Sequence, residues 1–170
     1  REFHLWVAPS IVSLCVHSLV SYHHKIVFSS ADAANAFARA YLTCQTQHWG
    51  HAEYVLRYEL FSQILKYALQ HHIITLEDFY EDDLYVMTKL HDTQDTYIHN
   101  ELHYLQSRLQ YRLGDEHPEY TLKKKFRHVD PLYIQDGKLH RLSKDHPEFK
   151  LFLQTHRTLN EQGIQATIIR

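Results

Sequence analysis

A stretch of helix-compatible sequence from Pro9 to about Gln45 most constrains how this chain can fold. Apolar side chains in its first half, from Ile11 to Phe28, recur at spacings that let one face of a helix enter a core. An alanine-rich run of high helix propensity follows between Ala31 and Ala40. Proline fits the first turn of a helix, so Pro9 marks a start. We therefore predict one long helix over about residues 9–46.

Shorter patterns predict the remaining elements. A strongly amphipathic helix is expected at about 52–71, because its apolar residues follow three-and-four spacing. Further helices are expected at about 75–80, 82–91 and 94–111. Strands are expected at about 121–129, followed by a hairpin at 132–142 that turns at Asp136-Gly137. A helix at about 148–162, ended by Gly163, and a last strand at 164–169 complete the expected elements.

These elements indicate a fold that is mainly α with a small α+β C-terminal part. The pattern changes from helices to short strands beyond Gly114. We therefore expect a helical part over residues 1–113 and a small α+β tail over residues 114–170.

Composition limits the classes of partner. The 170 residues are 44% hydrophobic, enough for a sizeable core, and 18 Lys and Arg against 20 Asp and Glu give a net charge of −2. No global electrostatic attraction to nucleic acid or to a membrane surface is expected. No apolar run approaches the roughly 20 residues of a membrane-spanning helix. Cys15 and Cys44 sit on apolar faces without a partner motif, so we expect free thiols, no disulfide and a cytoplasmic protein.

Tyr22-His23-His24-Lys25 is the stretch whose side chains could bind a ligand. On the predicted helix, Lys25 lies three residues after Tyr22 and shares its face. A tyrosine can stack on a ligand ring, and an ammonium can meet a phosphate as a point charge. Tyr22, His24 and Lys25 are therefore predicted to contact substrate. The alternative is a helix with a solvated lysine and amphipathic histidines.

Three other groups of charged or histidine side chains were weighed. Lys123, Lys125 and Arg127 would share one face of a strand and could hold a phosphate or an acidic partner, although lysines also protect a solvated edge strand. A second set has four-residue spacing: His91, Asp95, His99 and His103. Steps of four residues drift by about 40° each on a helix, so these side chains cannot converge on a metal, and we assign them to a solvated helix face. The acidic run Glu81-Asp82-Asp83 is assigned to a helix start, and no metal site is predicted in this chain.

The order of these motifs resembles the C-terminal half of HD-domain phosphohydrolases related to the deoxynucleoside triphosphate triphosphohydrolases. That family carries Tyr-x-His-Lys before an alanine-rich helix, as Tyr22-His23-His24-Lys25 does here. Similar later stretches are Leu76-Glu77-Asp78-Phe79, Asp82-Asp83-Leu84, Arg108 to Arg112, Lys125 to Pro131, Asp136-Gly137-Lys138 and Arg141-Leu142-Ser143.

The resemblance implies a hydrolase in which a metal-activated water attacks the phosphoryl group of a nucleotide or related phosphate ester. It also implies that Tyr22 borders the sugar or base, and that His24 and Lys25 face phosphate or a neighbouring subunit. The family's metal ligands lie upstream of the Tyr-x-His-Lys motif, and residues 1–20 do not supply them. His91-Asp92 lies after the motif, in another context, and Cys15 and Ser18 stand where the family often has arginine and tyrosine.

Two explanations remain open. The chain is a segment of a larger phosphohydrolase, inactive alone, whose divalent metal is not bound by this chain. Its expected partners are a nucleotide or phosphate ester and either the upstream part of the same polypeptide or an identical subunit in a homo-oligomer. Alternatively, it is a non-catalytic, degenerate relative that serves oligomerisation or partner binding. A third reading, a pH-responsive binding protein, rests only on the 16 histidines.

Overall fold

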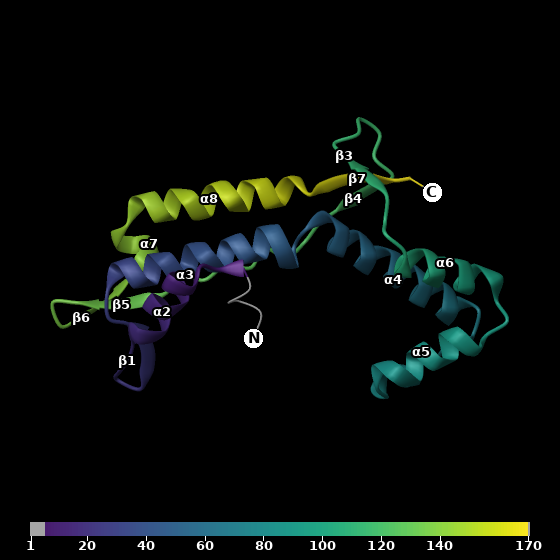
Figure 1. Cartoon of the computed structure of the whole chain (residues 1–170), viewed down its shortest axis with the longest axis horizontal. Coiled ribbons are helices and arrows are strands. Elements are labelled where there is room, and N and C mark those ends of the chain that lie inside the picture. Colours follow the sequence, from purple (N-terminus) through teal and green to yellow (C-terminus); the bar gives the residue numbers. More distant parts are fainter. Residues whose placement is uncertain (1–5, 170) are drawn as a thin grey trace. The chain divides into compact units, whose positions relative to one another are not determined.

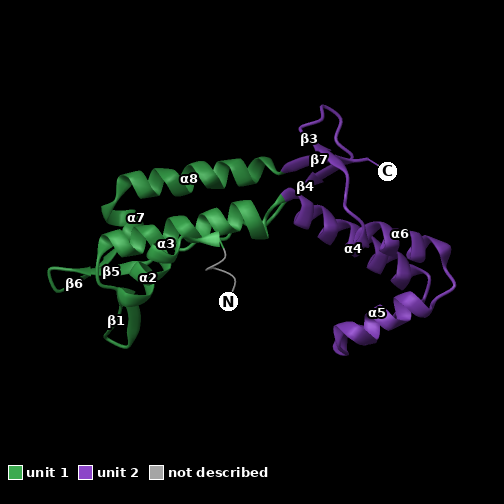
Figure 2. Ribbon diagram, in the orientation of Figure 1, with its two compact units in different colours: residues 1–51, 123–163 green, residues 52–122, 164–170 purple. Residues whose placement is uncertain are grey.

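Helices make up most of this computed structural model, which describes residues 6–169. The predicted class, mainly α with a small α+β C-terminal part, is confirmed. Residue contacts divide the chain into two compact units (Figure 2), and each unit takes its residues from two stretches of sequence. Unit 1 comprises residues 1–51 and 123–163, and unit 2 comprises residues 52–122 and 164–170. This division into units differs from the boundary expected at residue 113. That boundary separated a helical part from an α+β tail, and it stays a prediction.

Unit 1 combines helices with a four-stranded sheet (Figure 1). Its elements are α2 (Pro9–His17), β1 (Leu19–Tyr22), β2 (Lys25–Phe28), α3 (Ala31–Cys44), the π-helical turn η1 (Gln45–Trp49), β5 (Leu132–Gln135), β6 (Lys138–Arg141), α7 (Leu142–Asp145) and α8 (Pro147–Gln162). The strand order is β1-β2-β5-β6. Both outer pairs are antiparallel hairpins, and β2 meets β5 in parallel where Phe28 pairs with Tyr133.

The core of unit 1 joins both stretches of its sequence. Phe28, Tyr133 and Phe149 are buried together with the small residues Ala34 and Ala38 of α3. Small side chains let α3 lie close to the sheet, as the alanine-rich run predicted. The Arg39 guanidinium of α3 lies 4.2 Å from the ring centre of Phe152 on α8.

The single helix predicted over residues 9–46 is wrong in its middle. Helix α2 ends at His17, a β-hairpin occupies 19–28, and α3 begins only at Ala31. The hairpin turns at His23 and His24, whose φ angles are 43° and 61°. Positive φ at both central residues is the geometry of a tight hairpin turn, and histidine enters this region more readily than most side chains. The Ser30 hydroxyl then caps α3 by accepting a hydrogen bond from Ala33 N at 3.3 Å.

Unit 2 consists of helices and a three-stranded sheet of order β3-β7-β4. Its elements are α4 (Ala52–Gln70), the 3₁₀ turn η2 (Glu77–Tyr80), α5 (Asp83–Asp92), α6 (Thr96–Gln106), β3 (Tyr111–Leu113), β4 (Tyr120–Leu122) and β7 (Ile164–Ile168). Two hydrophobic clusters share α4. Leu56 and Leu60 pack toward the sheet, and Ile64 and Ala68 pack against α5 and α6.

The second half of the predicted elements is mostly confirmed. The Asp136-Gly137 turn has φ values of 49° and 70° and joins β5 to β6 in the expected register. Gly163, with φ 76°, ends α8 as predicted, and β7 follows it. The strand predicted at 121–129 is wrong beyond Leu122, because residues 123–131 pair with no strand among the described residues. The helix predicted to reach 111 ends at Gln106.

Candidate functional site

The Tyr22-to-Lys25 stretch forms the tip of the β1–β2 hairpin rather than a helix face. Tyr22 and Lys25 are paired across the turn, so their side chains lie on the same face of the hairpin. The Tyr22 hydroxyl donates a hydrogen bond to the Gly137 carbonyl at 3.1 Å, which ties this hairpin to the tip of the β5–β6 hairpin. His24 and Lys25 are exposed. The premise of a shared helix face is therefore wrong, and the substrate role of Tyr22, His24 and Lys25 stays a prediction.

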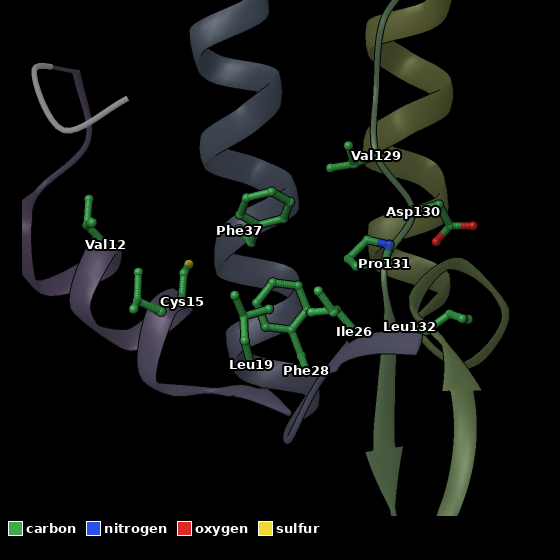
Figure 3. Close-up of a pocket in the computed structure, with 11 residues that line it drawn as sticks. Val12, Cys15, Leu19, Ile26, Phe28, Phe37, Val129, Asp130, Pro131 and Leu132 are labelled. Carbon is green, nitrogen blue, oxygen red and sulfur yellow. The ribbon is translucent and has the colours of Figure 1, made fainter. Parts of the chain in front are cut away.

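An apolar pocket of about 550 Å³ opens on the other face of the hairpin (Figure 3). Side chains alternate between the faces of a strand, so the register that puts Tyr22 and Lys25 on one face puts Ile26 and Phe28 on the other. Ile26 and Phe28 line the pocket, together with Leu19 of β1. None of the predicted substrate residues is among its walls.

The walls of the pocket come from segments far apart in the sequence. The lining residues lie on α2, β1, β2, α3 and the segment 129–132 that enters β5. Phe28 and Phe37 face the same space, as Figure 3 shows, and their ring centres are 5.4 Å apart. The rim is exposed: Ile26 keeps 79% of its surface in contact with solvent, Val16 60% and Leu19 45%.

The two polar groups of the pocket are not available to a charged ligand. The carboxylate of Asp130 points away from the two phenyl rings and accepts hydrogen bonds from the Ser143 backbone N at 3.0 Å and hydroxyl at 2.7 Å. The second group is the Cys15 thiol, whose pKa is raised by burial, so it stays protonated at neutral pH. The pocket therefore suits apolar groups. Leu19, Ile26 and Phe28 were recognised as apolar positions in the sequence, but they were assigned to a helix.

The basic segment, which we define as residues 123–128, keeps the alternation expected of it without forming a strand. Lys123, Lys125 and Arg127 are exposed, whereas Lys124 and Phe126 are half-buried. Lys124 Nζ donates to the Gly50 carbonyl at 2.6 Å, and burial lowers the pKa of Lys124. Only the exposed cations can meet an anionic partner, and that role stays a prediction.

A polar cluster beside the core of unit 1 was not anticipated from the sequence. The buried Tyr133 hydroxyl lies 3.4 Å from Asp145 Oδ2 and 3.3 Å from His146 Nε2. His140 Nδ1 contacts the same Asp145 oxygen at 2.9 Å. Burial, followed by the nearby Asp145 charge, raises the pKa of Tyr133, so its hydroxyl stays protonated and ties α7 to the sheet.

Two of the residues of unit 2 that stand at four-residue steps, Asp95 and His99, have structural partners. Asp95 caps α6 by accepting from Ile98 N at 3.0 Å, and the Tyr67 hydroxyl donates to it at 3.1 Å. His99 Nε2 donates to the Thr93 carbonyl at 2.7 Å. Within residues 6–169, no three His, Cys, Asp or Glu side chains are grouped so that they could hold a metal ion. The described residues therefore do not fit the divalent metal that the family resemblance implies.

Comparisons with protein-family models, curated proteins and solved structures gave no match to this chain. Across the part of the chain that the structure describes, no helix has the length and apolar character needed to cross a membrane.

Proposed function

We propose that this chain is a segment of an HD-type phosphohydrolase acting on nucleotides or related phosphate esters, and that it contributes assembly rather than chemistry. The resemblance of Tyr22-to-Lys25 and of the later motifs to that family supports the enzyme class. The pocket beside the hairpin supports the assembly role, because its walls are apolar and its rim is open.

The exposed rim of the pocket is the observation that carries this proposal. Complete burial of an exposed Leu or Ile side chain contributes roughly 1.5–3 kcal/mol. Covering Ile26, which is 79% exposed, would contribute most of that amount, and covering Leu19, which is 45% exposed, about half of it. A protein chain that packs apolar side chains against Ile26, Val16 and Leu19 would remove the rim from water. The occupant we propose is the polypeptide that carries the metal ligands of the enzyme.

This arrangement assigns separate roles to the two faces of the hairpin. Ile26 faces the docked polypeptide, whereas Tyr22 and Lys25 lie on the opposite face and stay accessible. The Lys25 ammonium can attract a phosphate of the substrate as a point charge, and the hydrogen bond from Tyr22 to Gly137 steadies the tip that presents it.

A second candidate is an independent, non-catalytic module for oligomerisation or partner binding. The same pocket favours it, because apolar docking requires no chemistry from either partner. The two candidates differ in what accompanies docking: the first predicts phosphohydrolase activity in the complex, and the second predicts binding alone.

The test is a phosphate-release assay with Mg²⁺ or Mn²⁺ and a panel of nucleoside triphosphates. We expect no release of phosphate or triphosphate from this chain alone, and release after addition of the polypeptide encoded directly upstream of it. Binding of that polypeptide without activity would select the second candidate. Robust release by this chain alone, lost in Lys25→Ala, would contradict both candidates, and so would the absence of any polypeptide that binds the pocket.

A further inference from the structure

A group of large apolar side chains on unit 2 is exposed to solvent. We use the name η2–α5 surface for five exposed apolar side chains that lie within ten residues of sequence: Leu76, Phe79, Tyr80, Leu84 and Tyr85. Tyr80 is 91% exposed, Leu84 73% and Leu76 67%. Large apolar side chains that gather in this way on a soluble protein mark a surface that binds another molecule.

The charge around this surface determines what can bind it. Four exposed carboxylates flank the apolar side chains: Glu77, Glu81, Asp82 and Asp83. Asp82 is engaged as the N-cap of α5, but Glu77, Glu81 and Asp83 form no ion pair with any described residue. Acids at a helix start complement the helix dipole, but that does not account for exposed aromatic rings. A basic partner fits, because lysine and arginine stems cover apolar surface while their charges meet carboxylates and aromatic faces.

The chain itself carries a matching basic partner. In the basic segment of unit 1, Lys123, Lys125 and Arg127 are exposed and likewise form no ion pair with any described residue. Phe126 lies between these cations, and the Arg157 guanidinium is 5.3 Å from its ring centre. This segment offers the exposed cations that the η2–α5 surface requires.

We propose that two copies of this chain associate through contact between the η2–α5 surface of one copy and the basic segment of the other. The contact uses none of the residues that line the pocket of unit 1, so it does not depend on the proposed phosphohydrolase role. Because charges contribute to it, the association weakens as salt screens them. Because apolar area also contributes, it does not vanish when salt is raised.

The experiment is sedimentation equilibrium of the complete chain at low and high salt, from about 50 to about 500 mM. We expect reversible self-association whose dissociation constant rises with salt. Tyr80→Ser with Leu84→Ser should raise that constant by at least about tenfold, because such exposed side chains contribute to binding and not to the core. Circular dichroism checks that the variant keeps the helical content of the wild type.

Paired charge reversals test which surfaces meet. Glu77→Lys with Glu81→Lys, and separately Lys123→Glu with Lys125→Glu, should each abolish self-association. An equimolar mixture of the two variants should associate again, because each altered surface then meets its opposite charge. The matched control for the acidic surface is Glu116→Lys with Glu161→Lys, at two exposed positions outside both surfaces, which should associate like the wild type.

Three results would overturn the proposal. One is a wild-type chain that stays monomeric at low salt and high protein concentration. Another is association that survives the charge reversals of either surface. The last is a mixture of the two reversed variants that fails to associate although each is folded, since that would show that the two surfaces do not contact each other.

Discussion

Asp78 is the buried carboxylate that holds the turn before α5 in unit 2. Lys89 Nζ donates to its two oxygens at 2.7 and 2.8 Å, and Thr75 N donates at 2.8 Å. The bonds from Lys89, followed by the bond from Thr75, hold the pKa of Asp78 below its ordinary value, and the same pairing raises the pKa of Lys89. Both groups favour the folded state in their charged forms.

The first prediction concerns the pH dependence of this pair. Because the folded-state pKa of Asp78 is lowered, its contribution to stability is present above the ordinary aspartate pKa and is lost as pH falls through the folded value. Asp78→Asn should therefore unfold at lower urea concentration than the wild type at pH 7. The gap between the two midpoints should shrink on acidification toward about pH 3. Equal midpoints at neutral pH would contradict this account of Asp78.

Gly50 gives a second prediction at the scale of one residue. A methyl group added there would lie 2.6 Å from Lys124 Nζ and 2.7 Å from the Gln45 carbonyl oxygen. The backbone atom cannot move aside easily, so Gly50→Ala should destabilise unit 1 by about 1–3 kcal/mol through overpacking. Thermal unfolding measures the effect. A melting temperature equal to that of the wild type would show that η1 and the basic segment are not packed this closely.

At the scale of elements, a glycine substitution in the β1–β2 hairpin should change stability in opposite directions for a hairpin and for a continuous helix. His24 has φ 61°, a left-handed conformation that costs a non-glycine residue roughly 1–2 kcal/mol. His24→Gly should therefore stabilise the chain against urea, and His24→Val should destabilise it. In a continuous helix, the glycine would destabilise by about 1 kcal/mol instead.

The hairpin also shows how far the sequence could predict the fold. Helix α4 and the Asp136-Gly137 hairpin were predicted because each has a strong local signal, one in periodicity and the other in turn residues. In residues 19–28 the apolar side chains stand at the two ends, around the polar run from Ser21 to Lys25, so helical and strand periodicity were hard to separate. Serine is a favoured N-cap residue, so Ser30 could have indicated that a new helix begins after it.

The candidate site was less predictable than the fold. Tyr22 and Lys25 were predicted to share a face, and they do, but across a turn rather than along a helix. The pocket could not be predicted, because it depends on bringing segment 129–132 against α2 and α3. That contact joins residues about one hundred positions apart, and no local pattern encodes it.

At the scale of the whole molecule, unit 1 depends on both of its sequence stretches. Its core packs Phe28 and Ala34 from the first stretch against Tyr133, Leu142 and Phe149 from the second. A chain cut after residue 113 would expose that core, so we expect residues 1–113 alone to lose cooperative unfolding. Thermal unfolding followed by near-ultraviolet circular dichroism tests this. A cooperative transition in the cut chain would support the family-based division at residue 113 instead.

The central claim is that unit 1 docks a protein chain through one face of the β1–β2 hairpin and leaves the other face free. The most direct test is titration calorimetry of the upstream-encoded polypeptide into the wild type, Ile26→Asp and Lys25→Asp. Both substitutions place a carboxylate at an exposed position of the same strand, on opposite faces. The account predicts that Ile26→Asp weakens binding by at least about tenfold, because a charge would be buried in an apolar pocket, and that Lys25→Asp leaves affinity unchanged. Equal affinities for all three chains, or a loss confined to Lys25→Asp, would contradict it.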